Sequence, residues 1–256
     1  IMACRTIESR SSRLITILIT PFMSCSARIP IYLLLAGTFF AADAGTVMLG
    51  LYALGIVLAV VTARLMRRFL FPVDETPFVM ELPNYRLPSA KTTLRLAWDK
   101  AKGFATKAFT IIFVASVVIW FLQTFDIRFN LVSDQAQSML AGLGALVAPL
   151  FAPLGFGSWI AAAAVVAGFG AKENVAATLT VLMGGSVAAL STLFTPLTAY
   201  TFLTFILLYT PCVAAVSAVR NELGTRMMFA VVLMQCGVAW IVAFVVHATG
   251  RLLGLA

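Results

Sequence analysis

Residues 45–65 read GTVMLGLYALGIVLAVVTARL, and this stretch decides the fold class. It carries no charged side chain before Arg64, and Arg67 and Arg68 follow it closely. A helix of about 20 apolar residues is long enough to cross the ~30 Å hydrocarbon core of a bilayer. The stretch therefore predicts a transmembrane helix that ends at a basic boundary facing water.

The composition of the whole chain indicates the same class of protein. Of 256 residues, 61% are hydrophobic and 11% are charged. A soluble domain has about 45–50% apolar and ~25% charged residues, and it could not bury so much apolar surface. The composition therefore predicts an integral membrane protein that has no soluble catalytic domain.

Apolar blocks of membrane length recur along the chain, and several are interrupted. Pro21 and Pro30 lie inside the first block, and Gly168 and Gly170 lie inside a later one. Broken helices are tolerated at membrane depth where they face protein or a wet cavity. We predict an all-α, polytopic transmembrane helix bundle with broken or re-entrant helices and about six crossings. The blocks are 14–42, 45–65, 107–124, 157–183, 187–209 and 227–249, and residues 139–156 read as a half-helix.

The net charge of +8 is concentrated in one part of the chain. Half of the Lys and Arg residues lie between Arg64 and Lys107. Basic residues retained inside the cell set the orientation of membrane proteins. We therefore expect residues 1–13, 66–106 and the C-terminus in the cytoplasm, and residues 125–138 in the periplasm. Nucleic-acid binding is the less favoured explanation in a chain this apolar.

Residues 89–106 form a predicted amphipathic helix within the basic part. Leu94 and Trp98 fall on one face, whereas Lys91 and Arg95 fall on another. A basic helix with Trp on its apolar face suits the membrane interface, and the alternative is a solvated linker helix.

Two short segments resemble each other. Residues 3–8 (ACRTIE) and 218–222 (AVRNE) are each followed by another arginine and an apolar run. With five crossings between them they would lie on opposite sides of the membrane, which is the pattern of an inverted repeat. Coincidence is the alternative for a match this short.

Three charged residues lie inside apolar blocks, namely Arg28, Lys172 and Glu173. Charges at membrane depth are costly and commonly functional. Lys172 and Glu173 are neighbours, so on a regular helix they point about 100° apart and do not pair. A carboxylate at a glycine-flanked break predicts a cation site. The alternative is a structural role, in which Glu173 binds Lys172, Arg28 or free backbone amides.

Two of the four cysteines lie beside proline-disturbed breaks. Cys25 follows a proline in the first block, and Cys212 directly follows another. Thiolates are soft ligands that favour transition metals over Mg²⁺ or Na⁺. The alternative is that both are small packing residues, which is how we interpret Cys4 and Cys236. The predicted metal ligands are Cys25, Cys212, Glu173 and Met23.

Several chemistries find no support in the sequence. The single histidine, His247, excludes a histidine cluster and a Ser/His/Asp set. No GxxxxGK[ST] phosphate-binding loop occurs. We predict that the chain is not an enzyme and has no catalytic residues and no permanently bound cofactor.

Four segments together resemble the membrane region of the bacterial ferrous iron transport protein B family, and they occur in the same order. They are PFMSCSAR at 21–28, MELPNYRLP at 80–88, GAKE at 170–173 and YTPC at 209–212. The first two are specific, whereas AKE or PC alone means nothing. The resemblance covers essentially the whole chain.

The resemblance implies an Fe²⁺ permease of the bacterial inner membrane with two gate regions in inverted orientation. Cys25 and Cys212 match the gate cysteines proposed as iron ligands in that family. The implied regions are 1–65, the rest of the first gate and the following span; 66–106, a cytoplasmic loop with an interfacial helix; and 107–256, the second gate bundle.

Members of that family also carry a GTP-binding domain and further membrane helices before the sequence that corresponds to Ile1. The resemblance therefore implies that this chain is the C-terminal part of such a transporter and that GTP acts only through the preceding part. The expected partners are the lipid bilayer, Fe²⁺ as substrate, the GTP-binding half, small accessory proteins of iron uptake, and further copies of the chain. Nucleic acid is not an expected partner.

Two other functions stay open. The chain could be a membrane scaffold that does not transport, or a transporter of nucleoside-like solutes, because related gate regions have been linked to nucleosides. For iron transport, we expect Cys25, Cys212 and Glu173 to converge near the membrane midplane, since Fe²⁺ must exchange water for protein ligands. The carbonyls expected to complete the ligand shell are those of Pro21, Pro211 and Gly170.

Overall fold

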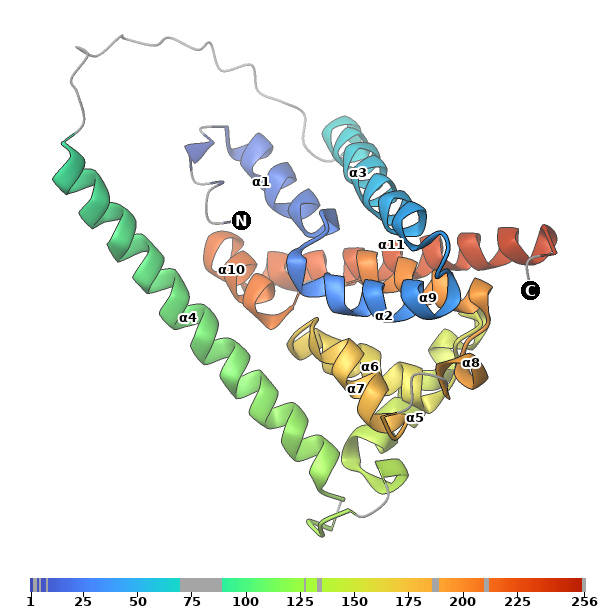
Figure 1. Cartoon of the computed structure of the whole chain (residues 1–256). Coiled ribbons are helices and arrows are strands. Elements are labelled where there is room, and N and C mark those ends of the chain that lie inside the picture. The colour runs from blue at the N-terminus through green and yellow to red at the C-terminus, as the bar shows by residue number, and fades with distance from the viewer. Residues whose placement is uncertain are drawn as a thin grey trace.

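The computed structural model describes residues 1, 4, 6, 7, 9–69, 89–126, 128–132, 135–185, 189–209 and 212–254. This part of the chain is a bundle of α-helices, whose extended pairing is confined to a bridge between Phe125 and Leu131 (Figure 1). The all-α prediction is confirmed. The predicted proline-rich loop with its MELPNYRLP motif, and the carbonyl of Pro211, lie outside the described residues.

The first apolar block forms a broken span. Two helices, α1 (Arg10–Ile19) and α2 (Ile29–Phe39), are joined by short 3-10 turns. Together they cover 30 residues, which is long enough to cross a membrane. Pro21 and Pro30 lack a backbone N–H, so each lies where the α-helical ladder stops or starts. The predicted break is therefore present.

α3 (Ala44–Phe69) contains the quoted apolar stretch and continues one turn beyond it. That last turn includes Arg67 and Arg68. Positive side chains near a helix C-terminus interact favourably with the helix dipole. The basic residues that end the membrane span thus also stabilise the end of the helix.

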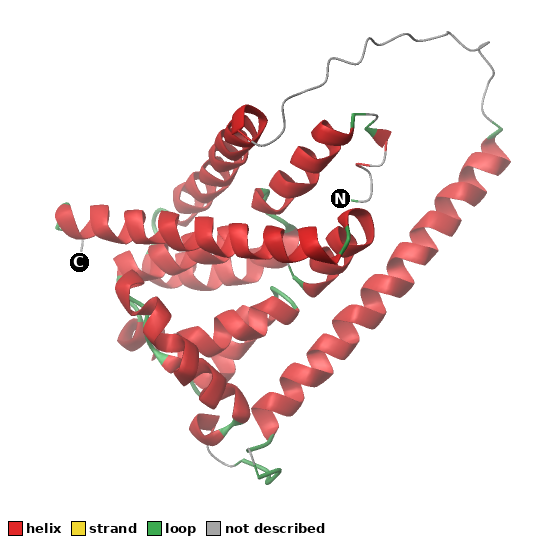
Figure 2. Cartoon of the chain, turned by 180° about the vertical axis from the view of Figure 1, so that it is seen from behind, coloured by secondary structure: helices red, strands yellow, loops and turns green. Residues whose placement is uncertain are grey.

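α4 (Ala90–Thr124) is one helix of 35 residues, about 52 Å long at 1.5 Å per residue. It contains both the predicted interfacial helix and the predicted third span, with no break between them. No proline interrupts this sequence, so nothing forces the helix to stop at the boundary. Its N-terminal half stands away from the bundle (Figure 2).

α5 (Met139–Phe151) and α6 (Trp159–Gly170) form a bent pair whose axes differ by 106°. Gly155 turns the chain between them with a φ of 85°, a conformation that favours glycine. Gly144 lets the helices meet closely, because a Cβ there would lie 2.9 Å from the Cβ of Ala163. α7 (Asn174–Leu182) and the short α8 (Leu190–Leu193) follow.

The segment from α5 to α8 folds back on itself. It begins beside the end of α4, where the N–H of Met139 donates to the carbonyl of Phe125. It leads into α9 (Pro196–Leu208), whose first residues pack against Gly250 near the end of α11. By length and composition, the α5–α6 pair is either a broken span or a re-entrant element, and the described residues contain four helices long and apolar enough to cross a membrane, or five if this pair is one span.

The last helices form the centre of the bundle. α9 lies in the main hydrophobic core and packs along α11 (Thr225–Leu252), and α10 (Val213–Leu223) continues from α9 after a break. Phe205 stacks on Tyr209 and meets Phe151 edge to face, with ring centroids 5.4 and 5.2 Å apart. Aromatic pairs in these arrangements contribute beyond their buried area.

One hydrophobic cluster joins distant segments at one end of the bundle. Cys4 packs in it with Met66 of α3 and Val219 of α10. The two segments that resemble each other, 3–8 and 218–222, therefore lie at the same end. The two segments therefore do not lie at opposite ends, as five crossings between them would require, and the inverted repeat stays a prediction.

The same cluster corrects the expected position of the C-terminus. Val231, in the second turn of α11, belongs to the cluster. Arg251 follows Val231 by 20 residues on the same helix, so it lies at the opposite end of α11, about 30 Å away. The structure therefore places the C-terminus at the far end of α11 from this cluster, and not beside residues 1–13 as expected.

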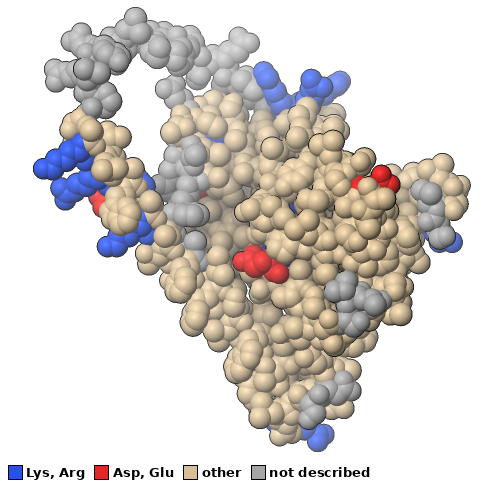
Figure 3. All heavy atoms as spheres, viewed as in Figure 1, with Lys and Arg blue, Asp and Glu red and all other residues tan. Residues whose placement is uncertain are grey.

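Basic residues are concentrated on one part of the surface. In Figure 3, most of the blue lies over the end of α3 and over the N-terminal half of α4. Arg220 and Arg226 border the turn between α10 and α11, near the cluster that also holds the end of α3. The corrected arrangement thus places these arginines where the positive-inside tendency expects them.

Candidate functional site

The first helix break presents Cys25 on extended backbone. α1 ends at Ile19, and Cys25 lies between the two 3-10 turns with φ −104° and ψ 160°. The thiol side chain is exposed, as is Met23. Both predicted soft ligands therefore lie in non-helical backbone beside Pro21.

Arg28 fixes the conformation of this break from inside. Its side chain is 2% exposed, and its guanidinium donates to the carbonyls of Pro21 at 3.1 Å and Met23 at 3.2 Å. Its buried Nε has no hydrogen-bond partner among the described residues. The carbonyl of Pro21, a predicted metal ligand, is thus already bound by a cation of the protein.

The second break lies between α9 and α10. α9 ends at Leu208, and Cys212 is the residue before the first turn of α10, with extended backbone at φ −56° and ψ 161°. Its side chain is half-buried. The break falls near the middle of the 28-residue apolar stretch Pro196–Leu223. Both cysteines therefore interrupt segments of membrane-crossing length.

A third break, between α6 and α7, inserts Lys172 into the interior. Lys172 is 2% exposed, and its Nζ donates to the carbonyl of Ile206 at 3.4 Å and of Tyr209 at 3.3 Å. It also lies 4.5 Å from the centroid of the Tyr209 ring, which is a cation–π distance. The tip of the folded-back segment is in this way attached to the end of α9.

The Tyr209 hydroxyl occupies a space beside Gly168 that any larger side chain would fill. The hydroxyl donates to the carbonyl of Val165 at 3.5 Å. A Cβ at Gly168 would collide with the Tyr209 hydroxyl and with Val175. The glycine read from the sequence as a helix breaker therefore serves instead to admit the tyrosine that holds Lys172.

Lys172 interacts electrostatically with groups from several elements. The groups within electrostatic range of Lys172 are Arg28 and the thiols of Cys25, Cys212 and Cys236. Cys236 lies on α11, and no motif marks it in the sequence. Its proximity, like that of Tyr209, could be found only once the helices had been placed.

Glu173 does not join this centre. Its side chain is exposed, and the partners of Lys172 and Arg28 in the described part of the chain are carbonyls and a ring. Neither the structural pair nor a shared site is formed by it. No three His, Cys, Asp or Glu side chains among the described residues lie close enough to hold one metal ion. The ligand roles of Cys25, Cys212, Glu173 and Met23 stay predictions.

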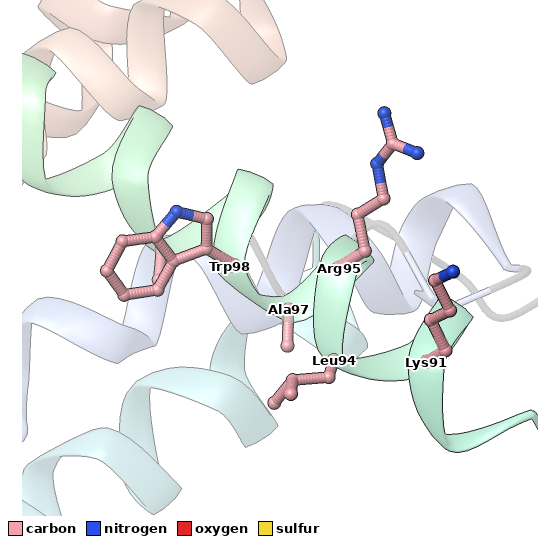
Figure 4. Close-up of a pocket in the computed structure, with 6 residues that line it drawn as sticks. Lys91, Leu94, Arg95, Ala97 and Trp98 are labelled. Atoms are coloured by element: carbon pink, nitrogen blue, oxygen red, sulfur yellow. The ribbon is translucent and has the colours of Figure 1, made fainter.

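Several hollows accompany the helices. One of about 580 Å³ lies along the N-terminal half of α4, with Trp98 and Leu94 beside Arg95 and Lys91 (Figure 4). Another, of about 540 Å³, lies between α6, α9 and α11 and is lined by Phe205, among others. The α4 hollow has the apolar and basic faces predicted for that helix.

Helices that break at mid-length, with buried cations and cysteines at the breaks, form the architecture of transporters with discontinuous helices. The fold and the site therefore define an α-helical membrane protein of the transporter class.

Comparison with known proteins gives the family. The family described as "Ferrous iron transport protein B C terminus" matches residues 48–100, and Gate, described as "Nucleoside recognition", matches residues 105–226. The Fe(2+) transporter FeoB of Staphylococcus aureus (strain MSSA476) is 43% identical over 260 residues, which cover 98% of this chain and 39% of that protein. The Fe(2+) transporter FeoB of Methanocaldococcus jannaschii is 38% identical over 264 residues, with 99% and 39% covered.

The Fe(2+) transporter FeoB of Campylobacter jejuni is 33% identical over 266 residues, with 95% of this chain and 43% of that protein covered. The chain belongs to the ferrous iron transport protein B family and corresponds to the C-terminal membrane region of its members. It spans about two fifths of the length of these relatives. No solved structure matches the chain.

Proposed function

We propose that the chain is the membrane permease portion of a transporter that moves Fe²⁺ across the bacterial inner membrane. The observation that supports the proposal is the contact between two helix breaks, in which the buried Lys172 of the α6–α7 break binds carbonyls that precede Cys212 at the break after α9. The relatives named as Fe(2+) transporters support the choice of ion.

The path for the ion follows from the chemistry of the ligands. Fe²⁺ must exchange its water for ligands that bind it well enough to admit it and weakly enough to release it. Cys25, with Met23 beside it, offers a soft station at the first break, and Cys212 offers one at the second. The exposed Glu173 adds a hard carboxylate that is next to Lys172 in the chain. No three His, Cys, Asp or Glu side chains of the described residues lie close enough to bind one ion together. We therefore propose that the ion binds at Cys25 and Cys212 one after the other, and not at one site that both share.

The chain needs no resident cofactor in this proposal, and it has no enzymatic activity of its own. Iron is the cargo, and GTP acts through a preceding half of the transporter. That half, small accessory proteins of iron uptake and further copies of the chain are the proposed partners, in addition to the lipid bilayer.

The nucleoside alternative has one observation in its favour, which is the description "Nucleoside recognition" of the Gate family. The hollow beside Phe205 is large enough for such a solute and has aromatic walls, including Tyr209 and Trp240. It has no amide or carboxylate side chain among its lining residues, whereas recognition of a base needs placed polar groups. The iron pathway is therefore preferred.

Iron uptake into proteoliposomes tests the proposal against a scaffold role. We expect anaerobic ⁵⁵Fe²⁺ to accumulate in vesicles that contain the chain together with a supplied N-terminal half, and Mg²⁺ not to compete. Protein-free vesicles give the background. Uptake equal to that background, with and without the N-terminal half, would favour the scaffold.

The arrangement of the ends leads to a topology proposal with five crossings, made by the first broken span, α3, α4, the α9–α10 span and α11. Residues 1–13 and the basic half of α4 face the cytoplasm, and residues 125–138 and the C-terminus face the periplasm. In this proposal the α5–α8 segment enters and leaves on the same side of the membrane, so it adds no crossing. The five crossings that remain are an odd number, which places the two ends of the chain on opposite sides.

Cysteines introduced at Ala90, Asn130 and Leu252, all exposed, test this topology. We expect a membrane-impermeant maleimide to label positions 130 and 252 in intact spheroplasts, and position 90 only after permeabilisation. The parent chain, which has only its native cysteines, serves as the control for labelling of those thiols. Labelling of position 252 only after permeabilisation would show that the number of crossings is even.

A further inference from the structure

Two buried cations stand at the two cysteine-bearing breaks, and they share one arrangement. Arg28 binds carbonyls that precede Cys25, and Lys172 binds carbonyls that precede Cys212. In both places a helix has been unwound and its freed carbonyls face a basic side chain. Transporters with discontinuous helices use such carbonyls to coordinate the ion that they move.

Lys172 and Arg28 bind their carbonyls with different chemical groups. Arg28 uses the two terminal nitrogens of a planar guanidinium, one for each carbonyl, whereas Lys172 uses a single Nζ for both. Lysine also presents a compact charge on a flexible four-carbon stem. The group at the second break is therefore the one that can be displaced.

The charges around Lys172 give a reason for displacement. Its partners in the described part of the chain are two carbonyls and the Tyr209 ring, and none of them is a carboxylate. A divalent ion that reaches Cys212 brings two further positive charges into the same low-dielectric space. Repulsion between like charges is strong there, since it is little screened by water. The ion and the Lys172 side chain therefore compete for the carbonyls of Ile206 and Tyr209.

We propose that Lys172 is a tethered cation that occupies these two carbonyls in the empty protein and is displaced when a divalent ion binds at Cys212. The proposal rests on the iron pathway above. Lys172 is thus a positioning residue, because it keeps the second break filled and closed to ions until a thiol-bound metal replaces it. The exposed carboxylate of Glu173 lies next to it in the chain and is a natural partner for the released side chain.

Chemical labelling of the unaltered chain tests the displacement directly. An amine-reactive ester is applied to the detergent-solubilised protein with and without saturating Co²⁺ under anaerobic conditions, and modified lysines are located by mass spectrometry. Labelling of the buried Lys172 is expected to rise about tenfold or more with Co²⁺, as its occupancy of the carbonyls falls. The exposed Lys91 and Lys102 serve as internal controls and are expected to react equally in both samples. A Lys172 that stays protected at saturating Co²⁺ overturns the proposal.

Metal affinity gives an independent measurement. Lys172→Met removes the competing charge at similar volume, so Co²⁺, followed by its thiolate charge-transfer absorbance, is expected to bind about tenfold more tightly. Lys172→Arg keeps the charge and is expected to bind no more tightly than the parent chain. Tighter binding by neither variant, or by both, contradicts the competition.

The two proposals can fail separately. Both measurements use a Cys25→Ser background, so that the thiol of the first station gives no signal. If Cys212→Ser leaves the Co²⁺ absorbance of this background unchanged, the proposed iron station at Cys212 fails. If Cys212→Ser abolishes the absorbance while Lys172→Met binds Co²⁺ no more tightly than the background, the station stands and only the tethered cation is wrong.

Discussion

Replacement of both Cys25 and Cys212 by serine is expected to abolish Fe²⁺ uptake by a complete transporter of which this chain forms the C-terminal part. Serine keeps the size and the hydrogen-bonding capacity of the side chain but removes the soft thiolate that favours iron over Mg²⁺. Even groups that only orient a metal ligand change affinity by about 10–100-fold. Loss of the proposed ligands at both stations should therefore lower uptake by at least ~100-fold.

The matched control is Cys4→Ser, which changes a thiol outside the pathway. Cys4 packs with Met66 and Val219 at the end of the bundle, away from both breaks. It is expected to retain more than about half of the uptake, with a loss that reflects stability only. The measurement is anaerobic ⁵⁵Fe²⁺ uptake normalised to the amount of protein in the membrane. Normal uptake by the double variant would remove both cysteines from the pathway.

Gly168→Ala is expected to destabilise the bundle and to impair uptake together. The added methyl group would collide with the Tyr209 hydroxyl and with Val175 inside α6 and α7. Overpacking of a core in this way costs about 1–3 kcal/mol. Tyr209 has to move, and its carbonyl then moves away from Lys172. A melting temperature lower by about 2–4 °C per kcal/mol is expected in detergent.

Gly170→Ala provides the control on the same helix. A Cβ there would meet only side-chain carbons of Ala115 and Ile119 at 3.6 Å or more, which is ordinary contact. Glycine in a helix is also less favourable than alanine by up to ~1 kcal/mol. We therefore expect a melting temperature that is unchanged or higher, with normal uptake. If the two substitutions changed the melting temperature and the Fe²⁺ uptake equally, the space beside Gly168 that Tyr209 occupies would not be needed for stability or uptake.

The fold class was predictable because block length and charge placement report directly on the membrane. The apolar stretch from Gly45 to Leu65 and the arginines after it predicted α3 closely. Whether an apolar segment crosses the membrane or folds back was not predictable in the same way. Hydropathy measures how apolar a segment is, and a segment that folds back is as apolar as one that crosses. The 106° bend after α5 depends on Gly155 and on close contact at Gly144, which a single sequence does not reveal.

The site was predictable in its parts but not in its connections. Proline and glycine marked the breaks, and Cys25, Cys212 and Lys172 were recognised as unusual in their settings. Glu173 was expected to form a cation site, with binding to Lys172 or Arg28 as the alternative, because charges at membrane depth are commonly functional or paired. Carbonyls released by the breaks satisfy the cations instead. Tyr209 was noted only as part of the YTPC segment, because its contact with Lys172 depends on how α6 and α9 pack.

The length of α4 has a mechanical consequence. A rigid rod held near its C-terminal end amplifies motion, so a rocking of about 10° moves the far end of a ~52 Å helix by about 9 Å. The N-terminal end of α4 is exposed in the described residues, whereas near the other end Gln123 donates to Thr178 of α7 at 3.1 Å. α4 thus has the geometry of a lever whose long arm is its basic N-terminal half and whose held end contacts the helix that follows Lys172. A small force at the basic end would be converted into a smaller but stronger displacement beside Lys172.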